Sequence, residues 1–234
     1  MKFLYLIIFL STFLSCNSKK DSAVSKIKNP NPEKTGQKKL SGTEVVEELE
    51  KLGYFNFTSE SELDTVKADF KNSYNDLSFF QGPTREESLR FLDNRYHWID
   101  LEELFEIGGL TNYLAQVKPT FEKLGLELEF GNEKSQQADN SWKHTIELNG
   151  IEYVAFDGHF SDLDWGIAFV NFIEMLNAEL RRQNSVEQFF PVNSKNDGMF
   201  VLLTPEQLDF VLSIYSVENE NPTTMGTWKS LNGL

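Results

Sequence analysis

The chain has 234 residues, of which 40% are hydrophobic and 13% aromatic, so it is long enough and apolar enough to build a sizeable core. The formal net charge is −14; once the eight Lys and two acidic residues of positions 1–42 are set aside, residues 43–234 hold 14 basic and 34 acidic residues. Binding to nucleic acid requires Lys and Arg to replace phosphate counterions, so this acidic excess excludes nucleic acid as a ligand.

The first 15 residues have the pattern of a signal peptide. Lys2 is followed by an apolar run of about ten residues, which is too short to span about 30 Å of hydrocarbon. The small residue Ser15 then precedes Cys16, the only cysteine of the chain, so an internal disulfide or a cysteine-based metal site is excluded. This arrangement resembles the lipobox of bacterial lipoproteins, in which the signal is cut before a lipid-bearing cysteine.

The resemblance implies that Cys16 carries diacylglycerol and anchors the mature chain in the membrane through its acyl chains. The family prefers Leu and a small residue where this chain has Phe13 and Leu14, but looser boxes that end in Ser–Cys are familiar in the Bacteroidetes group. Asn17 stands where an Asp resembles an inner-membrane retention signal, so an outer-membrane lipoprotein is expected, at the periplasmic face or the cell surface. The other interpretation is an ordinary signal or an uncleaved anchor with an incidental cysteine.

The rest of the chain divides into a tether, a domain and a tail. Residues 17–42 are rich in Lys, Asn and Pro and show no apolar periodicity, which is typical of a flexible basic tether. A single acidic domain is expected over 43–216, with a polar tail over 217–234. Helical spacing of apolar residues predicts helices over about 43–52, 59–70, 84–94, 99–107 and 110–124, the last kinked or split by Pro119.

Alternating apolar residues then predict strands. The clearest signal is Asn149-Gly150 between two alternating runs, which is typical of a hairpin with a type I′ turn. Ser161 is expected to begin a long central helix that buries Trp165, and Thr204-Pro205 to begin a last helix that ends near Tyr215. The predicted strands cover 126–130, 142–148, 151–155, 189–192 and 199–203. A helical first half followed by about five mainly antiparallel strands indicates an α+β fold.

Two clusters of polar residues are candidate sites. The first contains Asp157, His159, Asp162 and Asp164, which together could hold a hard cation or supply a base, His159, beside a carboxylate. The alternative favoured by the sequence is a helix start, in which Ser161 caps the helix and the carboxylates complement its dipole.

The second cluster surrounds Arg95 and His97, which lie among aromatic residues and are candidate binding residues. Here too a structural explanation is favoured, because Asp100 can cap the helix that follows. His144 lies on the apolar face of its strand and is expected to be a hydrogen-bonded core residue.

Two functions of different classes follow. The first is a non-enzymatic binding domain at the cell envelope, possessing no cofactor and no assigned catalytic residue; one version is an immunity-like protein that neutralises a cationic toxin. The second is an envelope hydrolase or metal-dependent binding protein that uses Asp157, His159, Asp162 and Asp164. The chain contains no P-loop, Gly-x-Gly-x-x-Gly, Gly-x-Ser-x-Gly or His-Glu-x-x-His motif, which favours the first.

Overall fold

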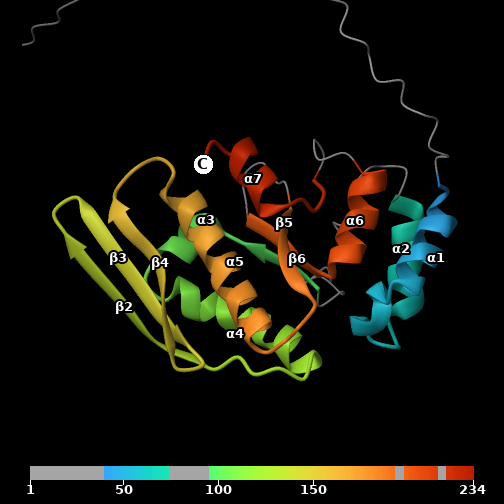
Figure 1. Ribbon diagram of the computed structural model, residues 1–234, viewed down its shortest axis with the longest axis horizontal. Helices are drawn as coiled ribbons and strands as arrows, with labels where there is room; N and C mark the ends of the chain where they lie inside the picture. Colours follow the sequence, from blue (N-terminus) through green and yellow to red (C-terminus); the bar gives the residue numbers. More distant parts are fainter. Residues whose placement is uncertain (1–39, 74–94, 193–197, 216–219) are drawn as a thin grey trace, which may run out of the picture. The chain divides into compact units, whose positions relative to one another are not determined.

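The computed structural model describes residues 40–73, 95–192, 198–215 and 220–234 (Figure 1). The predicted signal peptide, Cys16, residues 17–39 of the predicted tether and the helix predicted over 84–94 lie outside these ranges. The described residues all belong to one compact unit. Among the described residues, no helix has both the length and the apolar character needed to cross a membrane.

The predicted α+β class is confirmed, and the strands of the described part form two antiparallel sheets of three strands each. The sequence indicated about five strands. The first sheet has the order β1-β6-β5, made of Tyr96–Ile99, Gly198–Leu203 and Gln188–Val192. The second has the order β2-β3-β4, made of Phe130–Ala138, Ser141–Leu148 and Ile151–His159.

The helices pack in layers against these two sheets. They are α1 Gly42–Lys51, α2 Leu63–Ser73, α3 Leu101–Phe105, α4 Gly109–Lys123, α5 Asp164–Arg182, α6 Pro205–Ile214 and α7 Met225–Leu231, with a 3₁₀ turn, η1, at Tyr54–Phe57. In Figure 1, α4 and α5 lie between the sheets, and α1, α2 and α6 lie beyond the first sheet.

Strand β6 is buried along its whole length because it serves both cores. Successive strand residues point to opposite faces of a sheet. Phe200 and Leu202 therefore join the core around α4 and α5, whereas Met199, Val201 and Leu203 join the core beneath α1, α2 and α6.

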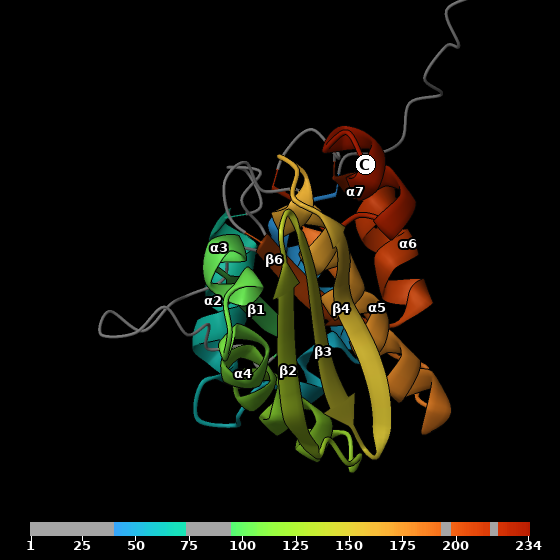
Figure 2. The same cartoon turned by 90° about the vertical axis from the view of Figure 1, so that its left-hand side faces the viewer.

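The second sheet has one buried face and one open face. Figure 2 shows it toward the viewer, with none of the described helices in front of it. Its outer face carries two ion pairs between strands. Lys134 of β2 reaches across β3 to Glu152 of β4 at 3.2 Å, and Lys143 of β3 pairs with Asp157 of β4 at 3.5 Å. A solvated face of this kind is common in antiparallel sheets that pack helices on one side only.

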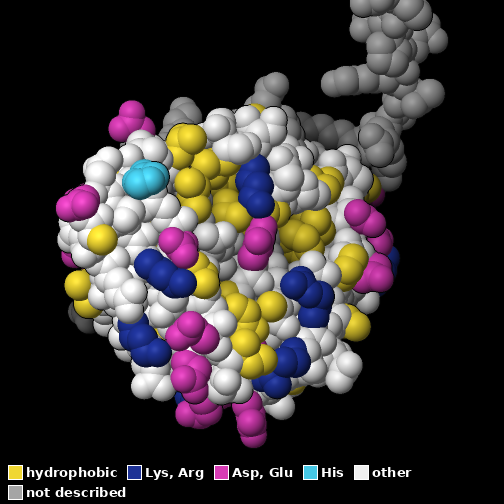
Figure 3. Space-filling view, turned by 60° about the vertical axis from the view of Figure 1, so that its left-hand side comes forward, with side chains coloured by type: hydrophobic (Ala, Val, Ile, Leu, Met, Phe, Trp, Pro, Cys, Tyr) yellow, Lys and Arg dark blue, Asp and Glu magenta, His cyan; other side chains and the backbone are white. Residues whose placement is uncertain are grey.

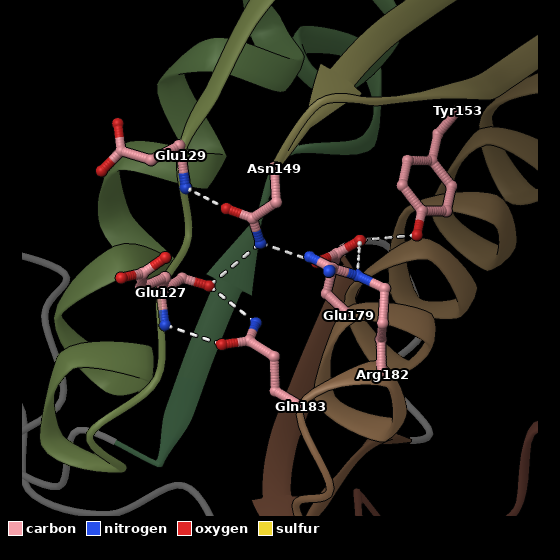
Figure 4. Close-up of polar contacts among 7 residues, drawn as sticks. All are labelled: Glu127, Glu129, Asn149, Tyr153, Glu179, Arg182 and Gln183. Carbon is pink, nitrogen blue, oxygen red and sulfur yellow. Dashed lines mark hydrogen bonds and ion pairs between the residues drawn. The ribbon is translucent and has the colours of Figure 1, made fainter.

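The hairpin predicted at Asn149-Gly150 is confirmed. Strands β3 and β4 pair Leu148 with Ile151, and the two turn residues have φ angles of +46° and +80°. Positive φ at both positions is what a type I′ turn requires, and Asn and Gly tolerate it best. The Asn149 side chain also ties the turn to the preceding segment, because it accepts from the Glu129 backbone N–H and donates to the Glu127 carbonyl (Figure 4).

Two strands escaped prediction. The segment Tyr96–Ile99, part of which was expected to be helical, pairs with β6 and is buried at both ends, so it shows no alternation of apolar and polar residues. Strand β2 is largely polar and more exposed, and its register is fixed by pairing with β3. Both segments are strands because they pair with a neighbouring strand. Their own sequences show little of the apolar alternation that predicts a strand.

Helix α4 runs without interruption from Gly109 to Lys123, although Pro119 was expected to kink or split it. Pro119 lies on the exposed side of the helix, as does Ala115, whose carbonyl loses its helical partner to the proline. Water can hydrogen-bond to a carbonyl on that side, so the helix continues.

The C-terminal residues do not form the expected polar tail. Helix α7 places Trp228 in the core, with its ring 4.9 Å from that of Phe169. The Thr223 N–H donates to the Pro191 carbonyl at 2.9 Å, which ties the segment before α7 to β5. Burial of Trp228 removes a large apolar area from water, and the bond to β5 adds a second attachment, so this mostly polar segment is part of the fold.

Candidate functional site

The predicted acidic cluster does not converge on one point. Asp157 forms its ion pair with Lys143 on the outer face of the second sheet, and His159 Nδ1 lies 3.3 Å from the Asn140 carbonyl oxygen, to which it can donate. The described ranges contain no group of three His, Cys, Asp or Glu side chains that could hold a metal ion.

Asp164 closes the turn that begins helix α5. Its carboxylate accepts hydrogen bonds from the Ser161 backbone N–H at 2.9 Å and from the Ser161 hydroxyl at 2.7 Å, and the same hydroxyl oxygen accepts from the Leu163 N–H. These bonds close a turn just ahead of the helix, whose own N-cap residue, Leu163, has no side-chain capping hydrogen bond, so Ser161 is not the expected cap. The helix begins at Asp164, three residues later than expected, and Asp162 is left exposed.

Arg95 is a buried structural residue. Its guanidinium donates to the carbonyls of Leu202 and Gly53 at 3.0 and 3.2 Å, and it lies over the rings of Tyr54 and Phe57. A guanidinium in contact with aromatic faces and backbone carbonyls joins the segment around η1 to β6.

His97 contacts the core around α4 and α5. Its Nε2 is 3.1 Å from the Thr120 hydroxyl, and its ring stacks on Phe200 and meets Phe189 edge-on. Loss of water around the ring lowers the pKa of His97 to about 4, so the neutral form is present at physiological pH. The two candidate binding residues, Arg95 and His97, therefore have separate partners within the fold.

A buried carboxylate that no local sequence signal indicates, Glu133, binds the start of helix α4. It accepts from the backbone N–H groups of Gly108 and Thr111, from the Thr111 hydroxyl, and from His144 Nε2 at 2.8 Å. Burial would raise the pKa of Glu133, but these four hydrogen bonds outweigh it and lower the pKa to about 2. His144 is thus the hydrogen-bonded core residue that its strand position predicted.

A second buried carboxylate, Glu179, holds the β3–β4 hairpin against the end of α5 (Figure 4). It accepts from Asn149 Nδ2 at 2.6 Å, from the Tyr153 hydroxyl at 2.7 Å and from the Arg182 guanidinium. Burial opposes ionisation, yet the bonds from Arg182, Tyr153 and Asn149 lower the pKa of Glu179. Both buried acids are satisfied by groups of their own chain, so they stabilise the fold and present no reactive group to a ligand.

The most unusual surface feature lies where β4 passes into α5. Phe160, Leu163 and Trp165 are 38, 43 and 49% exposed, and Leu231, at the end of α7, is 52% exposed. The end of α7 reaches the same place, because Leu234 lies 3.1 Å from the position that a Cβ would take on Gly166. We refer to Phe160, Leu163, Trp165 and Leu231 as the Trp165 patch. In Figure 3, hydrophobic side chains gather beside a histidine and among charged groups.

An aromatic stack supports this patch from below. The Phe160 ring lies 6.3 Å from Trp142, and Trp142 meets Phe105 edge-on at 4.3 Å. Trp142 also stacks on His144 at 5.2 Å and donates from its indole N–H to the Ser135 hydroxyl. Phe160 of the patch therefore adjoins an aromatic layer that contacts both β2 and β3.

The sequence indicated a candidate site in this segment, but predicted a charged site where the structure exposes apolar side chains. Asp157, His159 and Asp162 were selected for their charge, whereas the exposed surface between them is apolar. Trp165 was expected to be buried because it falls on the apolar stripe of α5. Trp165 lies in the first turn of the helix, where no neighbouring element packs fully over its side chain. Helical spacing shows which side of a helix is apolar, but not how far along the helix that side is buried.

Comparison with protein-family models, with curated proteins and with solved structures finds no match for this chain.

Proposed function

We propose that the protein is a lipid-anchored binding protein of the cell envelope that holds another protein through the Trp165 patch. The observation that carries the proposal is a set of four large apolar side chains, each between 38 and 52% exposed, where β4 passes into α5 and where α7 ends. Contiguous exposed apolar surface is typical of contact sites. Tryptophan is also among the residues that contribute most to binding between proteins.

A hydrolase that uses the acidic cluster has no comparable support. Asp157, His159 and Asp164 each bind a different group of the chain, and their partners account for their positions. General acid and base catalysis requires two groups that reach the same substrate. The proposal therefore assigns binding to this protein, with the outer membrane as its location.

The membrane anchor is tested at Cys16. The signal-like segment and the lipobox-like Ser15-Cys16 lead us to expect that the protein incorporates a palmitate analogue in growing bacteria. Cys16→Ser should abolish the labelling and release the protein from the membrane fraction. Labelling of the variant at the level of the unchanged protein would exclude lipidation at this residue.

Binding through the patch is tested by photo-crosslinking in cells. A photoreactive phenylalanine analogue placed at Trp165 should give an adduct with one partner protein. The same analogue at Val186, which is 67% exposed beyond the other end of α5, is the matched control and should not give that adduct.

The partner so identified should then bind Trp165→Ser at least about 30-fold more weakly, as expected for a central anchor worth about 2 kcal/mol. An unchanged melting temperature of the variant would show that the loss is confined to binding. Identical adducts from both positions, or an unchanged affinity, would contradict the proposal.

A further inference from the structure

The chain around the Trp165 patch is strongly acidic. The surrounding segments 100–107, 139–143, 157–166 and 229–234 contain eight Asp and Glu residues and two Lys. Both lysines are already occupied, Lys143 by Asp157 at 3.5 Å and Lys229 by Glu174 at 2.9 Å. The surroundings of the patch therefore carry a net negative charge that local ion pairs do not cancel.

Four of these acids are exposed and have no basic partner among the described residues; they are Glu102, Glu106, Asp139 and Asp162. They belong to segments that adjoin the patch, since α3 packs against α5 and the 139–143 segment pairs with the end of β4. Glu102 and Glu106 belong to or follow α3, whose Phe105 packs on Trp142. Asp139 precedes Asn140, whose carbonyl accepts from the Phe160 N–H at 3.1 Å, and Asp162 lies between Phe160 and Leu163 in the chain.

We infer that the Trp165 patch binds a cationic protein, which covers the apolar side chains and places Lys or Arg against Glu102, Glu106, Asp139 and Asp162. This inference rests on the proposed binding function and specifies its partner. A second copy of the chain would bring a second acidic ring against the first, and anionic lipid headgroups would be repelled in the same way. Basic side chains are the groups that complement an acidic rim around an apolar centre.

The test uses two synthetic amphipathic helices that differ only in charge. Both carry Leu on one face; one carries Lys on the other face and its counterpart carries Glu. Binding to the full mature chain, made soluble by Cys16→Ser, is measured by titration calorimetry. We expect the Lys peptide to bind at least tenfold more tightly than the Glu peptide, and its affinity to fall at least tenfold between 50 and 300 mM NaCl because salt screens the acidic rim.

Variants separate the patch from the general negative charge of the domain. Trp165→Ser should weaken the Lys peptide at least tenfold, and the double change Glu106→Gln with Asp162→Asn about fivefold. Glu206→Gln with Asp209→Asn, which removes the same charge from the exposed side of α6, is the matched control and should change the affinity less than twofold.

Three outcomes would overturn the inference in distinguishable ways. Equal binding of the two peptides that still requires Trp165 would leave the apolar binding site intact and refute the cationic partner. A dimer in sedimentation that Trp165→Ser dissociates would assign the patch to a second copy. If Trp165→Ser changes the affinity of neither peptide and the crosslinking at this position also fails, the proposed function itself is wrong.

Discussion

Gly109→Ala is expected to lower the free energy of unfolding by about 4 kcal/mol, a large loss for one methyl group. A Cβ at this buried glycine would lie 1.9 Å from the Glu103 carbonyl oxygen and 2.9 Å from that of Leu104. Both atoms belong to the backbone of α3, which cannot move aside as a flexible side chain can. Relief of the clash would separate α3 from the start of α4, where Glu133 is bound.

The neighbouring Gly108 is the matched control. It has a φ of +90° and no atom within 4 Å of its would-be Cβ, so alanine there meets backbone strain without a clash. Strain of this kind costs about 1–2 kcal/mol. Urea unfolding of both variants, produced from Asn17 onward, measures the difference. Equal losses of stability at the two positions would contradict the prediction that Gly109 is required because α3 packs closely on it.

Glu133→Gln is expected to lower the free energy of unfolding at pH 7 by about 3–5 kcal/mol. The glutamine amide cannot accept the four hydrogen bonds that the carboxylate receives, and its NH₂ group would face the donors of Gly108, Thr111 and His144. The carboxyl is only 9% exposed, so water cannot replace the lost bonds. Denaturant unfolding of the two proteins at one pH gives this loss directly.

The same change should remove part of the acid sensitivity of the fold. Because the pKa of Glu133 is lowered from 4.5 to about 2 in the folded state, the unfolded state binds the proton first as pH falls. The stabilisation from this carboxylate is therefore complete above pH 4.5 and is lost as pH falls toward 2, by about 3 kcal/mol. The stability difference between the unchanged protein and Glu133→Gln should shrink over that interval.

Glu152→Gln provides the control for these measurements. Glu152 lies in the same sheet but pairs with Lys134 on the open face, where both side chains are more than half exposed. An exposed ion pair contributes at most about 1 kcal/mol, so this variant should unfold nearly as the unchanged protein does. A comparable loss of unfolding free energy in both variants would show that the hydrogen bonds at the start of α4 stabilise the fold no more than an exposed ion pair does.

The candidate site shows how far local sequence signals reach. Ser161, Asp162 and Asp164 indicated a helix start, and the hydrogen bonds between Ser161 and Asp164 do form that turn. The signal is local because both partners lie within one turn of the chain. Nothing in the segment indicates that Trp165 remains half exposed, since its cover would have to come from elements distant in the sequence.

The sequence by itself determined the features whose partners lie within a few residues. The Thr204 and Gln207 capping box begins α6, and Asn149-Gly150 turns β3 into β4, because side chains and φ preferences at those positions suffice. Only the tertiary structure decided the pairing of Tyr96 with Val201, 105 positions apart, and the meeting of Glu133 with the start of α4. Such contacts depend on how distant elements pack, and the same packing decides which apolar side chains, Trp165 among them, stay uncovered.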